Sequence, residues 1–245
     1  MADYEGEAAY ARAHRGWGEL VLNRPARRNA LIGPMVTDLR AGLAALLAGG
    51  AKAILLRGEG GAFCSGLDVD AFAADPAPEW RAGFQRDWAA WHADLYACPA
   101  VLVGALERFA INGGASMALG CDLLVAGEGA TLFVGEAAQG MYAPMNTAWL
   151  RLRTTEHLAA QLALGAERIT GAELHRLGLA WKVTPDDQVL ATATDAAARL
   201  GAFPGNGLAA IKEALRRPLA VAGADTFEAL RTPAVATNAA PGRAT

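Results

Sequence analysis

Short apolar runs bounded by glycine, proline and asparagine predict the strands of this chain. Strands are expected at residues 17–22, 52–57, 101–106, 123–126 and 131–134, with a last short strand at 181–183. Residues 1–15 show no clear period and predict either a frayed start or an edge strand. A turn with a proline and a helical pattern separate the first two strands. Strands that alternate with helices in this way predict an α/β fold.

Apolar residues at intervals of three and four predict the helices. One such pattern starts after Pro34 and closes at a pair of glycines. A second carries a stripe of large side chains and stops at Pro99; the stripe fits core packing, and it also fits the wall of an acyl pocket. Its members are Trp80, Phe84, Trp88, Trp91 and Leu95. Beyond residue 144 helices are expected at 154–164, 170–178, 186–202, 206–217 and 223–231. Helices gathered at the C-terminal end predict an assembly surface.

The stretch 110–122 joins two predicted buried strands and carries almost only small or apolar side chains. Its Gly113 and Gly114 mark the start of a short buried helix. The first N–H groups of a helix have no partner within it, and glycine lets a ligand approach them, so the stretch could hold an oxyanion or a phosphate. The alternative is that the glycines only allow close packing against a neighbouring strand.

Two further segments carry candidate chemistry. Residues 63–68 follow the strand 52–57 and a glycine-rich turn, and a backbone N–H from there could join that of Gly113 in an oxyanion hole. Glu136 stands just past the predicted strand 131–134. A single glutamate is usually a solvated surface residue, but its place at the end of a buried strand favours a functional carboxylate.

Composition narrows the class of protein. The chain has 245 residues, 53% of them hydrophobic, which suits one large domain better than two. The net charge of −3 offers no basic surface for nucleic acid. Cys64, Cys98 and Cys121 lack the spacing of a metal site, so reduced thiols and no bound metal are expected. No run of about eighteen apolar residues occurs, which predicts a soluble, cytoplasmic protein without a membrane span.

Four motifs in this order resemble the crotonase superfamily, the enoyl-CoA hydratase and isomerase family. They are the segments 22–30, 63–68, the stretch around Gly113, and 170–179. The resemblance implies a spiral of β-β-α units over residues 1–185 and a C-terminal helical region over 186–245. It also implies assembly into a homotrimer, or a hexamer made of two trimers, and an acyl-CoA substrate of fatty acid metabolism. No separate cofactor is expected, because coenzyme A arrives as part of the substrate.

The resemblance also assigns roles to single residues. It implies that the amides of Ser65 and Gly113 converge on the thioester oxygen and that Glu136 faces them as acid and base. It places Arg27 and Arg28 near the CoA nucleotide, although both could be ordinary solvated arginines. Further residues expected to bind substrate are Ala30, Gly66, Leu67, Asp68, Ser116 and Tyr142. Of these, Asp68 is expected to cap a helix rather than react. For Tyr142, packing is favoured over a polar contact to the substrate.

The carboxylates decide which reaction is favoured. Hydratases of this family use two glutamates, and this sequence has Ser116 at the first position and Glu136 at the second. A hydroxyl without a visible base cannot activate water as a carboxylate does. The pattern therefore favours an isomerase with one glutamate. Decarboxylases, hydratase-like enzymes and carbon–carbon bond-forming enzymes with one glutamate stay open, as does a CoA-ester-binding protein without catalysis.

Two departures from the family pattern, and the placement of the histidines, complete the expectations. The loop 141–146 replaces one that is commonly rich in glycine, which suggests an unusual acyl group. The lysine that often reaches CoA from the last helix has no clear counterpart beyond Lys212. The histidines, which are His14, His92, His157 and His175, show no partner pattern and receive no role.

Overall fold

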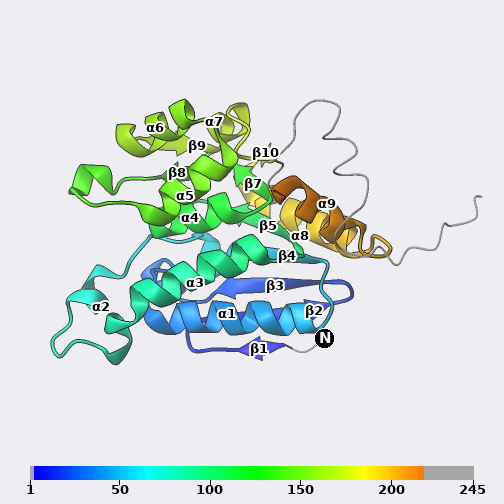
Figure 1. The fold of residues 1–245 in the computed structure, drawn as a ribbon, viewed down its shortest axis with the longest axis horizontal. Helices are drawn as coiled ribbons and strands as arrows, with labels where there is room; N and C mark the ends of the chain where they lie inside the picture. Colours follow the sequence, from blue (N-terminus) through cyan, green and yellow to red (C-terminus); the bar gives the residue numbers. More distant parts are fainter. Residues whose placement is uncertain (1–2, 218–245) are drawn as a thin grey trace, which may run out of the picture.

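The computed structural model describes residues 3–217, and a seven-stranded sheet runs through its centre (Figure 1). Its strand order is β1-β2-β3-β4-β5-β7-β10. The first three strands pair antiparallel, and β3, β4, β5, β7 and β10 pair parallel. The bounds are Tyr4–Glu5 for β1, Ala9–His14 for β2, Trp17–Leu22 for β3, Ala53–Gly58 for β4, Val101–Leu106 for β5, Leu123–Gly127 for β7 and Lys182–Thr184 for β10.

A second, three-stranded sheet gives the fold its spiral form. It consists of β6 (Phe109–Ile111), β8 (Thr131–Phe133) and β9 (Arg168–Thr170) in the order β6-β8-β9. Single bridges of Cys64 to Ala110 and of Leu31 to Leu67 extend the same pattern toward the N-terminus. Successive turns of the chain therefore place one strand in the large sheet, one extended segment beside the small sheet, and then a helix. The predicted β-β-α spiral is confirmed.

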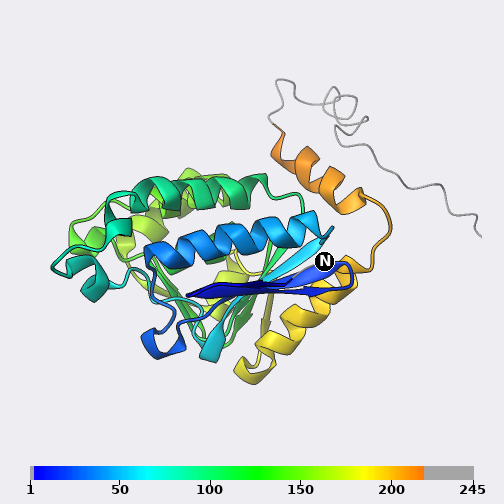
Figure 2. The same cartoon turned by 90° about the horizontal axis from the view of Figure 1, so that it is seen from below.

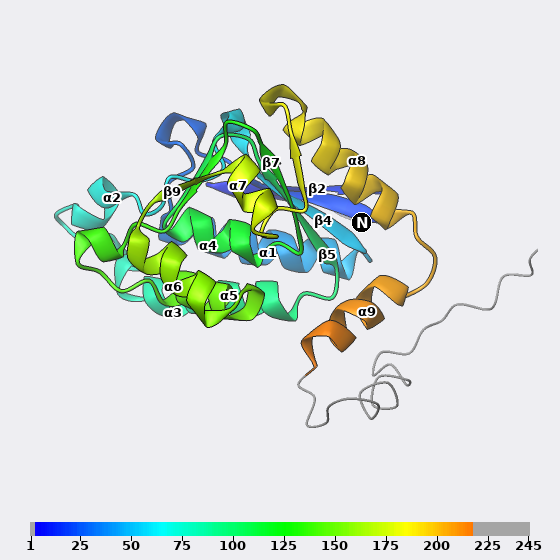
Figure 3. The ribbon, with the colours of Figure 1, turned by 90° about the horizontal axis from the view of Figure 1, so that it is seen from above.

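Nine α-helices of the described residues surround these sheets. Figure 2 shows α1 and α3 over one face of the large sheet and α8 over the other. Figure 3 shows α9 beyond the end of α8, where its Arg216 donates a hydrogen bond to the carbonyl of Tyr96 at the end of α3. The bounds are Gly33–Ala48 for α1, Val69–Ala73 for α2, Phe84–Ala97 for α3, Gly113–Gly120 for α4, Pro144–Arg153 for α5, Glu156–Gly165 for α6, Gly171–Arg176 for α7, Val189–Gly201 for α8 and Gly207–Arg216 for α9.

Alternating side chains of the central strands build a core on each face of the sheet. In β4, Ile54 and Leu56 belong to the larger core under α1, whereas Ala53 and Leu55 face the core under α8. Each fully buried leucine or isoleucine contributes about 1.5–3 kcal/mol. Both faces of this strand are therefore covered, as its continuous apolar run requires. Because α8 packs on the sheet, the proposed division of the chain at residue 185 does not detach that helix from the core, and the division stays a prediction.

The structure confirms some of the predicted elements and corrects others. The N-terminal segment was expected to be a frayed start or an edge strand, and the strand alternative is confirmed: β1 lies at the edge of the sheet, and β2 pairs with both β1 and β3. The strands β6 and β9, each three residues long, were not expected. Trp80 lies in a separate 3-10 turn, Glu79–Ala82, so the aromatic stripe does not belong to one continuous helix. The helix expected at 223–231 lies outside the described residues.

Candidate active site

A cavity of about 480 Å³ is lined by segments that are distant in the sequence. It lies where the segment 65–72, helix α3, the N-terminus of α4 and the segment 136–146 meet. Ser65, Gly113, Ser116 and Glu136 all line it. Phe84 and Trp88 line it as well and also belong to the buried core. Two residues of the aromatic stripe therefore belong to the core and also line this cavity.

The amide of Gly113 is available to a ligand. Gly113 begins α4, and its N–H has no hydrogen-bond acceptor within residues 3–217. The preceding Asn112 adopts a φ of 52°, in the left-handed region that side chains other than glycine rarely occupy. Its N–H donates to the carbonyl of Phe133 at 2.8 Å, and its Oδ1 accepts from the N–H of Gly135 at 2.9 Å. Contacts to the segment after β8 thus hold the backbone that aims the Gly113 amide.

The amide of Ser65 already has a partner. Its N–H donates to the carbonyl of Arg28 at 3.1 Å, beside a bond from Leu31 N–H to the carbonyl of Gly66 at 2.8 Å. The segment around Ser65 is paired with residues 28–31, and this pairing uses the donor that was expected to serve an oxyanion. Of the two amides expected to converge, only that of Gly113 is unengaged among the described residues. The Ser65 N–H can reach a ligand only by sharing its hydrogen between two acceptors or by leaving Arg28.

Glu136 faces the cavity as a buried carboxyl group. It is 9% exposed, and its Oε1 accepts a hydrogen bond from Nδ2 of Asn146 at 2.8 Å. Its Oε2 and the Oδ1 of Asn146 are buried without a hydrogen-bond partner among the described residues. Burial raises the pKa of Glu136 above its ordinary value, and the bond from Asn146 opposes that rise. A buried acceptor without a donor is costly, so both oxygens are suited to a ligand with hydrogen to give.

Ser116 is held by a chain of buried polar groups that the sequence did not reveal. Trp149 Nε1 donates to His92 Nδ1 at 2.8 Å, and His92 Nε2 lies 3.2 Å from Ser116 Oγ. Indole can only donate, so Nδ1 of His92 carries no proton and the neutral ring carries it on Nε2. Burial lowers the pKa of His92 to about 3, which keeps the ring neutral. Ser116 therefore accepts from His92 and passes its own hydrogen to the carbonyl of Gly113 at 2.8 Å.

The predicted nucleotide-binding turn is organised by one carboxylate. Asp68 accepts hydrogen bonds from Arg24 at 2.9 Å and from Arg27 at 2.8 Å, and its side chain caps α2 at the N–H of Ala71. These donors, that of Arg27 first, lower the pKa of Asp68 to about 2. Asp68 is thus a capping residue, as expected. Arg24 also donates to the carbonyl of Ala30 at 2.6 Å. Arg28 is exposed and has no ion-pair partner within the described part of the chain.

Comparison with known proteins identifies the family. The sequence model described as enoyl-CoA hydratase/isomerase matches residues 13–239. The chain belongs to this family. It is 30% identical over 206 residues to 2,3-dehydroadipyl-CoA hydratase of Escherichia coli strain K12, a match that covers 83% of this chain and 79% of that protein.

Other relatives differ in the reaction that they are named for. This family member is 28% identical over 214 residues to 1,2-epoxyphenylacetyl-CoA isomerase of the same strain, across 85% of this chain and 82% of that protein. Among solved structures, an enoyl-CoA hydratase from Polaromonas sp. JS666 superposes with a TM-score of 0.75 at 29% identity, across 84% of this chain and 82% of that one. The chain is thus a crotonase-superfamily protein, and the names of its relatives include both hydratases and an isomerase.

The cavity wall around Tyr142 and Leu67 is less packed in this family member than the sequence suggested. Tyr142 lines the cavity but is 77% exposed, so the core packing expected for it is wrong. Leu67 lines the cavity and is 39% exposed. Gly66 has a φ of 88°, and a Cβ there would lie 3.1 Å from the carbonyl of Ile111. Glycine therefore allows the close pairing that brings this loop against the β6 segment.

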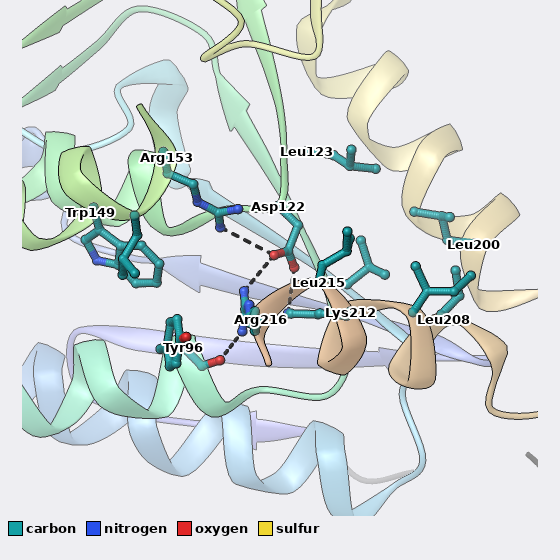
Figure 4. Close-up of a pocket in the computed structure, with 13 residues that line it drawn as sticks. Tyr96, Asp122, Leu123, Trp149, Arg153, Leu200, Leu208, Lys212, Leu215 and Arg216 are labelled. Atoms are coloured by element: carbon teal, nitrogen blue, oxygen red, sulfur yellow. Dashed lines mark hydrogen bonds and ion pairs between the residues drawn. The ribbon is translucent and has the colours of Figure 1, made fainter. Parts of the chain in front are cut away.

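A second cavity of about 410 Å³ lies between α9, α5 and the start of β7 (Figure 4). Asp122 forms ion pairs there with Lys212 at 2.6 Å, Arg216 at 2.8 Å and Arg153 at 3.4 Å. Lys212 also donates to the carbonyl of Ala100 at 2.6 Å and is 6% exposed. This lysine is therefore used to fix α9 on the core and is not directed at the first cavity.

Two negative observations apply to residues 3–217. No group of three or more histidine, cysteine, aspartate or glutamate side chains there is arranged to hold a metal ion. No helix in this range has the length and apolar character needed to cross a membrane.

The thiols of Cys64 and Cys121 are buried, and burial raises the pKa of each to about 12.

Proposed function

We propose that this protein is an enoyl-CoA isomerase in which Glu136 is the only acid and base. The observation that carries the proposal is that Glu136 is the one carboxylate among the described residues that line the cavity. Ser116, at the position of a second glutamate in hydratases, is buried and shares its hydroxyl between His92 and the Gly113 carbonyl. The two-carboxylate route to hydration finds no second carboxylate among the described residues that line the cavity.

The reaction needs one group that takes and returns a proton. Oε2 of Glu136 removes a proton from C2 of a 3-enoyl-CoA, between the thioester carbonyl and the double bond. The electron pair moves to the thioester oxygen, where the Gly113 N–H stabilises the dienolate at the N-terminus of α4. Glu136, now protonated, returns the proton to C4, and the electrons restore the carbonyl. The product is a 2-enoyl-CoA, and Glu136 is again ionised.

The test is Glu136→Gln, which keeps the side-chain size and removes the base. We expect turnover of 3-enoyl-CoA to fall by about 100-fold or more, with loss of deuterium uptake at C2 in heavy water and retention of CoA-ester binding. Intact turnover would refute the assignment. A panel of saturated, 2-enoyl, 3-enoyl and malonyl-type CoA esters separates isomerisation from the other one-glutamate reactions. Saturable binding without any exchange in the unmodified protein would favour the non-catalytic alternative.

The binding of the coenzyme A portion of the substrate follows from the same assignment. We propose that coenzyme A enters only as part of the substrate and that no other cofactor takes part. We further propose that Arg28, which is exposed and has no ion-pair partner among the described residues, contacts its phosphates. Arg27 is less suited to this, because Asp68 and Asp70 already bind its guanidinium at 2.8 Å and 2.7 Å. Action on fatty-acyl CoA esters in the cytoplasm remains our expectation.

Assembly is also a proposal. Ile211 and Leu215 of α9 are 62% and 82% exposed, and with Leu152 of α5 they line the second cavity (Figure 4). Exposed apolar side chains grouped in this way favour burial against another subunit. We expect a trimer, or a hexamer of two trimers, and light scattering after gel filtration measures which one forms.

A further inference from the structure

Asn146 lies between the proposed base and the oxyanion donor. It belongs to the first turn of α5, which begins with Pro144 at a position where the missing N–H costs nothing. Asn146 is 1% exposed and lines the first cavity. Its Nδ2 donates to Oε1 of Glu136 at 2.8 Å and to the carbonyl of Asn112 at 3.0 Å. Both partners are acceptors, so the orientation of the amide is fixed.

The bond to Asn112 acts on the Gly113 amide. The carbonyl of Asn112 and the N–H of Gly113 belong to the same peptide unit, which is planar and conjugated. A donor at the carbonyl oxygen polarises the unit and makes its N–H a stronger donor. The same carbonyl accepts the N–H of Ser116 at 3.1 Å. Asn146 therefore supports the amide that the structure leaves free for the thioester oxygen.

The bond to Glu136 selects one carboxylate oxygen. Oε1 is held by Asn146, whereas Oε2 is buried and has no hydrogen-bond partner within residues 3–217. A carboxylate fixed at one oxygen cannot rotate freely, so the other oxygen keeps one direction. That oxygen is also the more basic one, because no hydrogen bond stabilises its charge.

We propose that Asn146 is a positioning residue that links the two halves of the catalytic centre. One of its N–H groups fixes Glu136 so that Oε2 moves the proton, and the other strengthens the Gly113 amide. This inference rests on the proposed role of Glu136. It also assigns a role to the loop 141–146, whose departure from the family pattern was evident in the sequence while the role of Asn146 was not.

The test compares Asn146→Ala and Asn146→Asp with the unmodified enzyme on a 3-enoyl-CoA. We expect kcat to fall roughly ten- to a hundredfold, less than the ~100- to 1000-fold typical of losing an oxyanion donor itself. KM should change little, because the CoA portion binds elsewhere. The acid limb of the kcat/KM profile should move to higher pH, since Glu136 loses its donor. It should move furthest in Asn146→Asp, where a second carboxylate of similar shape faces the first.

Two controls separate positioning from loss of stability. Leu162→Ala removes a buried side chain of α6 that does not line the cavity, so it should lower the melting temperature without moving the acid limb. In the double variant Glu136→Gln with Asn146→Ala, the two losses should add only in part, because one of the two roles of Asn146 acts through Glu136.

The possible results distinguish the two proposals. A raised KM with unchanged kcat and an unchanged acid limb in both Asn146 variants would overturn the positioning role. Full additivity in the double variant would overturn it too. If instead Glu136→Gln keeps its turnover, the isomerase assignment itself fails, whatever the Asn146 variants do.

Discussion

Nε2 of His92 lies 3.2 Å from Oγ of Ser116, and neither side chain can take a proton from the other. His92 already carries its proton on Nε2, because Nδ1 accepts the indole N–H of Trp149 at 2.8 Å. Ser116 gives its own hydrogen to the carbonyl of Gly113. A serine and a histidine in contact suggest a nucleophile and a base. The direction of these hydrogen bonds instead gives the pair a structural role, which is to hold the first turn of α4 in place.

Ser116→Ala should therefore affect stability more than chemistry. The variant leaves Nε2–H of His92 without an acceptor, which should cost about 1–3 kcal/mol of unfolding free energy. Isomerase turnover should stay within about tenfold of the unmodified enzyme, since no proton transfer passes through this hydroxyl. Urea denaturation and initial rates measure the two effects. A loss of turnover as large as that of Glu136→Gln would show that Ser116 takes part in the reaction.

The stability of the protein should depend on His92 in acid. The folded-state pKa of about 3 lies below the ordinary value of 6.5, so the unfolded chain binds the proton first as the pH falls. The contribution of neutral His92 is complete above the unfolded-state pKa and is lost at up to about 1.4 kcal/mol per pH unit between the two values. Between about pH 7 and pH 4, the unfolding free energy measured by denaturation should depend less steeply on pH in His92→Phe than in the unmodified protein. Equal slopes in both proteins would contradict the buried, neutral histidine.

The activity should be lost in acid at a higher pH than the ordinary pKa of a glutamate would predict, because the reaction needs an ionised Glu136. Burial raises the pKa of this carboxyl from its ordinary value of 4.5, so the base becomes protonated and inactive at a higher pH than a solvated glutamate would. The acid limb of kcat/KM for a 3-enoyl-CoA should accordingly lie above that ordinary value. Rates across the acid range, corrected for unfolding at each pH, give the position of the limb. A limb at the ordinary value would mean that water reaches the carboxylate freely.

Arg28→Ala should weaken binding of the CoA portion without slowing the chemistry. A charge-assisted contact to phosphate is worth roughly 1.5–3 kcal/mol, so KM for CoA esters should rise by about ten- to a hundredfold while kcat is kept. The matched comparison is the pantetheine thioester of the same acid, which lacks the nucleotide and its charges and should show the same KM in both proteins. The substitution Arg27→Ala should instead lower stability, because it removes a donor from Asp68. An unchanged KM for CoA esters in Arg28→Ala would place the phosphates elsewhere.

The sequence by itself determined most of the elements and singled out Glu136 as the candidate base. Apolar runs such as 101–106 became buried strands because a strand covered on both faces must be apolar throughout. The stretch at Gly113 became a buried helix start because its side chains are too small and apolar for any exposed role. Glu136 was found because it directly follows a core strand, and Asp68 because its spacing to α2 is that of a cap.

Only the tertiary structure decided which polar groups meet. His92, Ser116 and Trp149 come from three different helices, and their alignment depends on how those helices pack rather than on any spacing along the chain. The same holds for Asn146, whose two acceptors follow separate strands, and for Ser65, whose amide is taken by the turn at Arg28. Hydrogen bonds act over about 3 Å and depend on direction. A sequence pattern can therefore predict that such residues line one cavity, but it cannot predict which atom donates a hydrogen bond to which.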